Sequence, residues 1–275
     1  MSLAAKLPWT HRFAGGYGGI GSQPLPTDAD AIDYLSRMAT ADGAGVETGV
    51  AVAVDAFFRG LKATPGLFDA IKASCILCGA RTLNGALVPM AGAAPANNNF
   101  ISDDYTRGGA TPGLKGNGSN KRLSQANPAT PLQNSAHQAI YLSANSAFAA
   151  PSEATHIAEW PTSGTAGRTQ ITTNTSQTFT RCRETTGSYL GSTSVGVIGI
   201  SRSDPADYVR RVGQASETIT ETSTGTPEQV VYVFNNSSGS YSDARLAFYS
   251  IGESLDLEAL DEAVSTLVTA IGAAV

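Results

Sequence analysis

The residues best suited to chemistry lie between positions 153 and 160. Glu153, His156 and Glu159 are spaced three apart with Trp160 beside them, so one helical turn would bring the carboxylates and the imidazole together. Such groups can bind a metal ion, but the same pattern also fits a solvated loop or a sugar-stacking edge. We predict no metal site here, because only one histidine is present.

A second acidic pair, Asp103 and Asp104, precedes Tyr105. Calcium binding or glycosidase chemistry needs carboxylates that converge in space, whereas adjacent residues on a strand point to opposite faces. The pair is therefore predicted to lie on a loop rim. The sequence contains no G-x-S-x-G motif, and no serine is tied to one of the three histidines. We predict no catalytic residues and a protein that is not an enzyme.

Two glycine-rich stretches resemble nucleotide-binding motifs only in spacing. "GYGGIG" at 16–21 fits G-x-G-x-x-G, but no apolar strand precedes it and no helix follows it. "GLKGNGSNK" at 113–121 lacks the spacing of a phosphate-binding loop and is typical of a turn between strands. We predict no cofactor.

The three cysteines are Cys75, Cys78 and Cys182. They cannot all pair within the chain, and the first two lie in the apolar run "SCILCG". A zinc or redox site would need further ligands at suitable spacing. We predict reduced, buried thiols that serve packing.

Aromatic residues in turn-rich segments are candidate contact residues, because a rigid ring offers a large contact area at a small entropic cost. Trp160, Tyr189 and Tyr241 are candidates for contact with a glycan or a partner, and Trp9 and Tyr17 for contacts of an N-terminal arm. Sugar platforms, protein-interface anchors and simple loop pins remain alternatives for each of them.

Composition restricts the class of protein. Only 15% of the 275 residues are charged and the net charge is −5, with Lys and Arg scattered singly. Nucleic-acid binding would need a basic patch, so we expect none. The sequence has no run of about 18 apolar residues and no apolar core for a secretory signal, so we expect a soluble protein made in the cytosol, without a membrane partner.

Three regions follow one another along the chain. Residues 1–26 are rich in Gly and Pro without periodicity, which predicts an extended arm that orders only against a surface. Residues 27–66 have helical periodicity, and residues 67–275 are predicted to form the main β domain.

Two helices are predicted in the second region. Thr27 is the expected N-cap of the first, and "ADGAG" at 41–45 ends it. The second helix ends at "ATPG" at 63–66, and its apolar residues recur at helical spacing: Val46, Val50, Val54, Phe57 and Leu61.

From residue 75 onward the pattern predicts short strands cut by turns. "CILCG", "NGALVPM", "HQAIYLSA", "GRTQITTNT", "QTFTRCRET", "VGVIGISRS", "QVVYVF" and "ARLAFYSIG" are β-branched or aromatic segments between Gly, Pro, Asn and Ser clusters. Their close spacing favours an antiparallel sandwich. "VVYVF" and "LAFYSI" are nearly continuously apolar, which predicts central strands.

The chain ends with an amphipathic helix. Its apolar residues recur every three or four positions, and either Ser254 or Asp256 can serve as N-cap. These apolar residues are Leu257, Leu260, Val264, Leu267 and Ile271. We expect this helix to fold back over the sandwich.

The segments "AIKASCIL" and "GARTL", then "NNNF", "GLKGNGS" and the final strand and helix, resemble a module of tailed-bacteriophage structural proteins. This module is the concanavalin-like, laminin-G-like jelly-roll domain found on tails, fibres and capsids, and the resemblance covers about residues 65–275. It implies a mainly β, antiparallel jelly-roll sandwich with a C-terminal helix. No catalytic or calcium-binding motif of the family is matched.

Three functions are compatible with that resemblance. The preferred hypothesis is a non-enzymatic virion structural protein, a capsid decoration or cement component, assembled in the host cytoplasm as a homo-oligomer, with a trimer favoured, beside proteins such as the major capsid protein. The alternative is a carbohydrate-binding tail adhesin that recognises host surface glycans. A polysaccharide-degrading enzyme using Asp104 or Glu159 has the least support.

Overall fold

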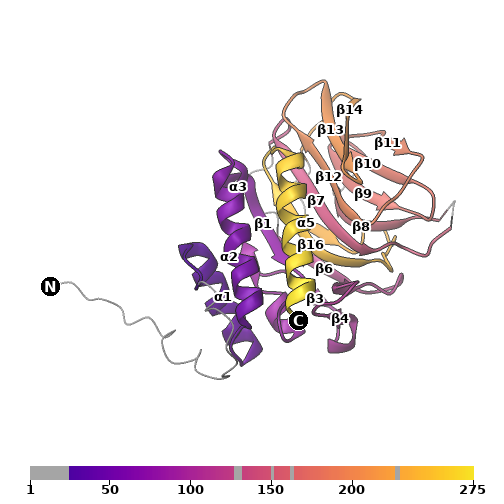
Figure 1. Cartoon of the computed structure of the whole chain (residues 1–275). Coiled ribbons are helices and arrows are strands. Elements are labelled where there is room, and N and C mark those ends of the chain that lie inside the picture. Colours follow the sequence, from indigo (N-terminus) through magenta and orange to yellow (C-terminus); the bar gives the residue numbers. More distant parts are fainter. Residues whose placement is uncertain (1–24, 127–131, 150–151, 162–163, 227–229) are drawn as a thin grey trace.

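The computed structural model describes residues 25–126, 132–149, 152–161, 164–226 and 230–275. Two antiparallel sheets pack face to face, and a layer of helices covers the outer face of one of them (Figure 1). The helices of the described residues are α1 (Ala29–Asp42), α2 (Thr48–Ala63), α3 (Leu67–Ala70), α4 (Leu83–Ala86), the short 3-10 helix η2 (Ser102–Asp104) and α5 (Leu257–Ala274).

Sheet A has nine strands and lies under the helices. Its main path runs in the order β14 (Ala215–Thr220), β13 (Asp207–Val212), β12 (Gly196–Arg202), β7 (Ala136–Ala144), β16 (Arg245–Gly252), β1 (Ile71–Ile76) and β2 (Pro89–Ala91). Two further short strands, β4 (Tyr105–Thr106) and β5 (Gly113–Lys115), extend the start of β16.

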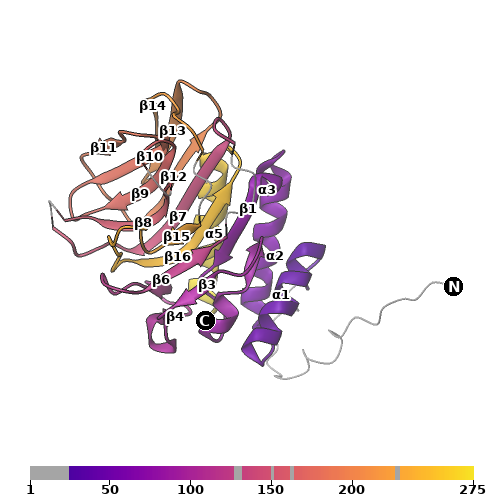
Figure 2. The same ribbon diagram turned by 180° about the vertical axis from the view of Figure 1, so that it is seen from behind.

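Sheet B has seven strands and forms the other half of the sandwich, on the side seen in Figure 2. The order is β11 (Ser188–Leu190), β10 (Thr178–Glu184), β9 (Arg168–Thr173), β8 (Ala154–Glu159), β15 (Val231–Val233), β6 (Arg122–Gln125) and β3 (Ala96–Asn98). The predicted antiparallel β-sandwich, with a helical N-terminal region and a C-terminal helix, is confirmed.

The molecule has two apolar cores, one on each face of sheet A. Ile140, Ile157, Ile171 and Tyr249 belong to the core between the sheets. The second core lies between sheet A and helices α1, α2 and α5, and Phe248 of β16 contributes to it. Adjacent strand residues point to opposite faces, so β16 supplies both cores.

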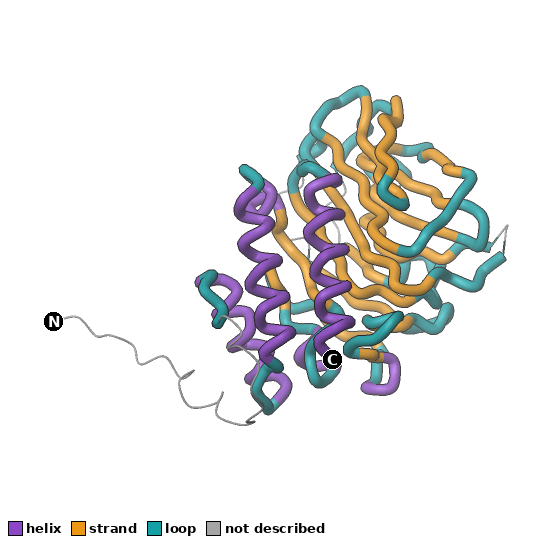
Figure 3. Tube along the Cα trace, in the orientation of Figure 1, coloured by secondary structure: helices purple, strands orange, loops and turns teal. Residues whose placement is uncertain are grey.

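Helix α5 covers sheet A as predicted. All five of its periodic apolar residues are buried, and Asp256 is the N-cap, accepting hydrogen bonds from the backbone of Glu258 and Ala259. Figures 1 and 3 show α5 running beside α2 over the strands. A buried ion pair between Asp261 of α5 and Arg211 of β13, 2.6 Å apart, ties the helix to the sheet.

Helices α1 and α2 share the core with α5. Asp28, and not the predicted Thr27, caps α1, because its carboxylate accepts from the N–H groups of Asp30 and Ala31. The N–H of Thr27 instead donates to Asp55 of α2 at 2.7 Å. The predicted C-terminal stop of α1 is confirmed at Gly43, which has φ +66°.

Several strand predictions were wrong in their limits. β1 begins at Ile71, before the predicted start of the strands at residue 75, because α3 is only one turn long. The first three residues of "NGALVPM" belong to α4, whose first turn is capped by Thr82, and only its last two residues join β2. The predicted central positions of β15 and β16 are confirmed.

We predict that Leu267→Ala in α5 lowers the free energy of unfolding by about 2–5 kcal/mol, because the substitution leaves a cavity in the helical core. Urea denaturation of this variant, beside the exposed neighbour substitution Thr266→Ala, checks it. Equal losses in the two variants would contradict the covering role of α5.

Candidate functional site

The outer face of sheet B carries no helices, since these cover the outer face of sheet A. Its middle is nevertheless buried, because Thr155 and Thr172 are 0% and Gln170 is 5% exposed. Its direction is fixed by Thr180 of β10, whose hydroxyl lies 2.9 Å from Tyr208 of the opposite sheet and so points inward. By strand alternation, the neighbours Phe179 and Arg181 point outward.

Trp160 and Arg168 lie at one end of this face. Trp160 follows β8, Arg168 begins β9, and the guanidinium carbon sits 4.1 Å from the centroid of the Trp160 ring. This is the stacking distance of a cation on an aromatic face. Arg168 also donates from Nη2 to the carbonyl of Gly164 at 3.2 Å. Both side chains are half-buried.

Phe179, Arg181 and Tyr189 continue the face across β10 and β11. The Arg181 guanidinium lies 4.7 Å from the centroid of Phe179, and the Phe179 and Tyr189 rings are 4.6 Å apart. The Tyr189 hydroxyl donates to Glu153 at 3.0 Å. Tyr189 is 56% exposed, so most of its ring is open to a ligand.

The turn between β10 and β11 needs a glycine to make room for these side chains. Gly187 has φ +88°, and a Cβ there would lie 2.4 Å from Phe179 Cζ and 2.6 Å from Arg181 Cγ. Any side chain would therefore displace the stacked pair.

We call these five side chains the aromatic strip: Trp160, Arg168, Phe179, Arg181 and Tyr189. Its halves meet at Gln170, which follows Arg168 by two residues on β9 and pairs with Arg181 across the sheet. The Gln170 amide donates to Thr172 at 2.6 Å and to Thr155 at 3.3 Å, which fixes the middle of the face. A further stacked pair, Arg122 on Tyr232 at 4.8 Å, lies on β6 and β15.

The strip has excess positive charge. Burial lowers the pKa of Arg168, and burial together with the nearby charge of Arg168 lowers the pKa of Arg181. Within the part of the chain that the structure describes, neither guanidinium lies in an ion pair. The two cations lie close together, and Glu184 and Glu153 act on the pKa of Arg181 in the opposite direction.

Of the predicted contact residues, Trp160 and Tyr189 lie on this one face, although Tyr189 belongs to strand β11 and not to a loop. Tyr241 is half-buried in the connection between β15 and β16, and Asn236 of that connection reaches Thr155 at 3.4 Å. Trp9, Tyr17 and the "GYGGIG" motif lie outside the described residues.

Sequence reasoning missed Arg168, Phe179 and Arg181. The period-two alternation of "RTQIT" and "TFTRC" marks these side chains as one face of a strand pair. The signal was present, but the pairing register of β9 and β10 was needed to combine the two halves.

The predicted grouping of Glu153, His156 and Glu159 in a helical turn was wrong, because β8 is a strand. His156 is buried and bonds Ser242 at 2.8 Å and Thr173 at 2.7 Å. Glu159 pairs with Arg183 at 2.8 Å inside the sandwich, where burial raises its pKa to about 7 although Arg183 acts in the opposite direction. Among the described residues, no three metal-binding side chains converge.

The other candidates have structural roles. Asp104 forms an ion pair with Lys121 and accepts from the Ile101 N–H, while Asp103 is exposed on η2 and not on a strand. All three cysteines are free and buried, and burial raises each thiol pKa to about 12. Their predicted packing role is confirmed.

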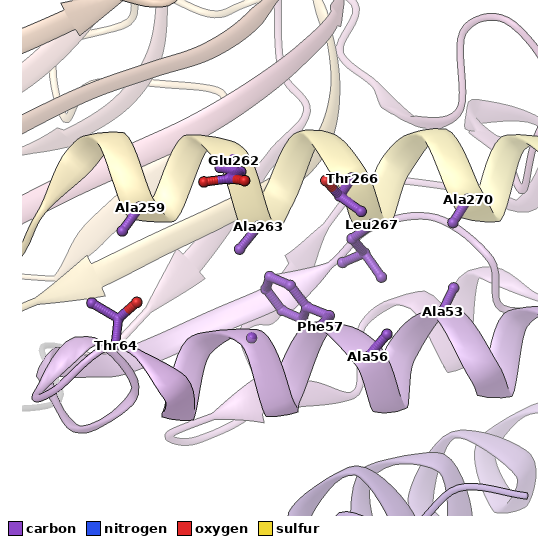
Figure 4. Close-up of a pocket in the computed structure, with 11 residues that line it drawn as sticks. Ala53, Ala56, Phe57, Thr64, Ala259, Glu262, Ala263, Thr266, Leu267 and Ala270 are labelled. Carbon is purple, nitrogen blue, oxygen red and sulfur yellow. The ribbon is translucent and has the colours of Figure 1, made fainter.

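A groove of about 320 Å³ runs between α2 and α5 (Figure 4). Phe57 and Leu267 lie across it, and small side chains such as Ala56, Ala263 and Ala270 line much of the remainder. Glu262 is its one charged lining residue, so the groove offers fewer binding groups than the aromatic strip. Within the described parts of the chain, no helix is long and apolar enough to cross a membrane.

No protein-family model and no curated protein matches the chain. Solved structures show distant similarity. The botulinum neurotoxin serotype D binding domain matches at 9% identity and a TM-score of 0.46, over 72% of this chain and 51% of that one. Trypanosoma rangeli sialidase matches at 10% identity and a TM-score of 0.48, over 79% of this chain and 39% of the sialidase. A Shewanella oneidensis protein of unknown function matches at 12% identity and a TM-score of 0.39, over 60% of this chain and 79% of that protein.

The chain thus spans about half or less of the first two of these structures. Its assignment rests on its own strand pairing. The class is an antiparallel β-sandwich with helices on the outer face of one sheet and stacked arginines and aromatic rings on the outer face of the other.

The two buried histidines give a pH prediction. Burial lowers the pKa of His156 to about 3 and that of His137 to about 4, so both stay neutral in the folded protein. The unfolded chain takes up protons near pH 6.5. The stabilising contribution of each is therefore complete above pH 6.5 and is lost as the pH falls toward the folded-state pKa.

We predict that unfolding free energy falls between pH 6.5 and 5, by up to about 1.4 kcal/mol per pH unit for each histidine. Urea unfolding at several pH values measures this slope. His156→Gln should lower the stability at pH 7 but give a shallower slope. An unchanged slope in that variant would show that His156 titrates alike in both states.

Proposed function

We propose that the protein is a non-enzymatic structural component of a bacteriophage particle, a capsid decoration, cement or accessory protein exposed on the virion surface. The proposal rests on the sequence resemblance of residues 65–275 to phage sandwich modules. It is supported by one structural observation, the division of the molecule into a helix-covered face and a face without helices. Such a division suits a unit that is anchored on one side and presents the other.

The anchoring side in this proposal is the helical layer with the N-terminal arm. The N–H groups of Thr27 and Asp28 both donate to Asp55 of α2, which fixes the start of α1 on that helix. Lys62 adds an ion pair to Asp28 at 2.7 Å. The described chain therefore begins at the helical layer, and residues 1–24 carry Lys6 and Arg12 but no acidic residue.

The partners in this proposal are further copies of the chain, as a trimer, and neighbouring virion proteins such as the major capsid protein. External subunits of closed particles are generally arranged around symmetry axes. A protein that is monomeric both in solution and on the particle would contradict this part of the proposal.

Immunogold labelling of intact particles with an antibody against residues 75–275 tests the location. We expect label spread over the head. Label confined to the tail tip would contradict a capsid role and place the protein among tail components, and unlabelled particles would contradict a virion role altogether.

The aromatic strip favours a second candidate function, the binding of a saccharide at the exposed ring of Tyr189 on the outer face of sheet B. Tyr189 exposes its ring while Phe179 supports it from behind, and Trp160 lies on the same face. Rigid aromatic faces are suitable platforms for sugar rings, because few rotamers are lost on binding.

We predict that Tyr189→Ala weakens saccharide binding severalfold to about tenfold, because it removes the exposed stacking surface. Calorimetric titration with a saccharide identified on a glycan array checks this. Ile101→Ala is the control, since Ile101 is an exposed apolar residue outside the strip. Equal effects of the two substitutions would place the saccharide elsewhere.

A further inference from the structure

We propose that the aromatic strip recognises an acidic saccharide, whose carboxylate or sulfate group is bound by Arg168 and Arg181 while its sugar ring lies against Tyr189. This inference rests on the second function above, saccharide binding, and adds the chemical class of the ligand. It is based on the unpartnered N–H donors and the stacked position of the two guanidinium groups, and not on any resemblance.

Both arginines of the strip have hydrogen-bond donors that no described acceptor uses. Arg168 uses only Nη2, toward Gly164, and its Nε is buried without a partner. Arg181 uses only Nε, toward Thr186 at 3.0 Å. Among the described residues no acceptor meets Nη1 of Arg168 or either Nη of Arg181. A carboxylate or sulfate accepts two parallel N–H bonds from such groups.

The arginines elsewhere in the sandwich show what a structural role requires. Arg202 is fully buried and donates to the carbonyls of Cys182, Asp204, Asp207 and others. Arg210 pairs with Glu217 and Arg211 with Asp261. Most donors of these three arginines are met within the chain, whereas those of the strip, like those of Arg122, are largely without a hydrogen-bond partner among the described residues. The strip arginines are therefore not explained by packing alone.

The two guanidinium groups are held in place before any ligand binds. Stacking on Trp160 and Phe179 holds each guanidinium by its flat face and leaves the N–H edge open. Gly187 leaves the space that this arrangement needs. An anion that binds here orders few new rotamers, so more of the interaction energy appears as affinity.

The charged groups in and beside the strip differ in sign from one end to the other. Glu153 accepts from the Tyr189 hydroxyl and acts electrostatically on Arg181, while Arg168 lies farther along the strip, stacked on Trp160. A ligand with one acidic group and several hydroxyls matches this polarity: the acid pairs with the arginines, and a hydroxyl can donate to Glu153. A uniformly anionic chain would meet Glu153 unfavourably.

Nucleic acid fits less well than a saccharide. The chain has a net charge of −5, and strong binding to a phosphate backbone needs many cations along a continuous track. The strip provides two neighbouring cations, with the Glu153 carboxylate beside Tyr189.

The test is a glycan array that displays uronic acid, sialic acid and sulfate-ester saccharides, each beside its neutral counterpart, probed with the full chain. We expect the acidic member of at least one pair to bind about tenfold or more tightly than the neutral one, as the loss of a charged hydrogen-bonded pair predicts. Raising the salt concentration should reduce this difference.

Variants then assign the selectivity to the strip. Arg168→Gln and Arg181→Gln should each reduce binding of the acidic saccharide about tenfold while leaving any neutral binding unchanged. Arg59→Gln is the matched control, since Arg59 is an exposed arginine on α2. The comparison of acidic and neutral saccharides on the unaltered protein remains decisive if a variant fails to fold.

The possible outcomes distinguish the recognition of an acidic group from saccharide binding in general. Equal binding of acidic and neutral saccharides would overturn acid recognition and leave saccharide binding standing. No binding to any saccharide would overturn both. Selective binding that survives both arginine substitutions would overturn the assignment to the strip, as would tighter binding of single-stranded nucleic acid than of any acidic saccharide.

Discussion

The pairing of β16 in the middle of sheet A is the constraint on which the rest of the molecule depends. β16 pairs with β7 along one side and with β1 and β5 along the other. Its residue Tyr249 enters the core between the sheets, while the adjacent Phe248 enters the helical core and meets Phe57 edge-on at 6.0 Å. One strand thus joins both layers, and α5 follows it after a short capped turn.

This arrangement makes the two sheets unequal. Sheet A has apolar side chains on both faces, because helices cover one and sheet B the other. Sheet B needs apolar residues only on its inner face, so its outer face can carry Thr, Gln, Arg and aromatic side chains without loss of the core. The helix-free, arginine-bearing face of sheet B is a consequence of where the final helix packs. The function proposed for the protein uses that asymmetry.

Elements with clear periodicity could be predicted from the sequence. The buried stripes of α2 and α5 and the apolar runs of β15 and β16 are repeated patterns that tertiary contacts reinforce. β8 could not be recognised, since its buried residues include His156 and Glu159, which are satisfied by partners distant in sequence. The segment at Leu83–Ala86 was mistaken for a strand because its helix is only one turn long.

The candidate site could be predicted only in part. Trp160 and Tyr189 were identified as contact residues from their type, but their common face depends on the order of β8, β9, β10 and β11. Arg183 illustrates the difficulty: it adopts φ +60° at an irregularity of β10, which directs it to Glu159, whereas Arg181 two residues earlier faces outward. A single sequence does not reveal such a local change of direction.

The central claim is that the helical layer faces a support and the aromatic strip faces away from it. An electron cryomicroscopy reconstruction of the particle with the protein in place measures this orientation directly. We predict that α1, α2 and the arm lie against the particle, and that Arg168, Arg181 and Tyr189 are exposed to solvent. A map in which sheet B rests on the particle and the helices point outward would contradict it.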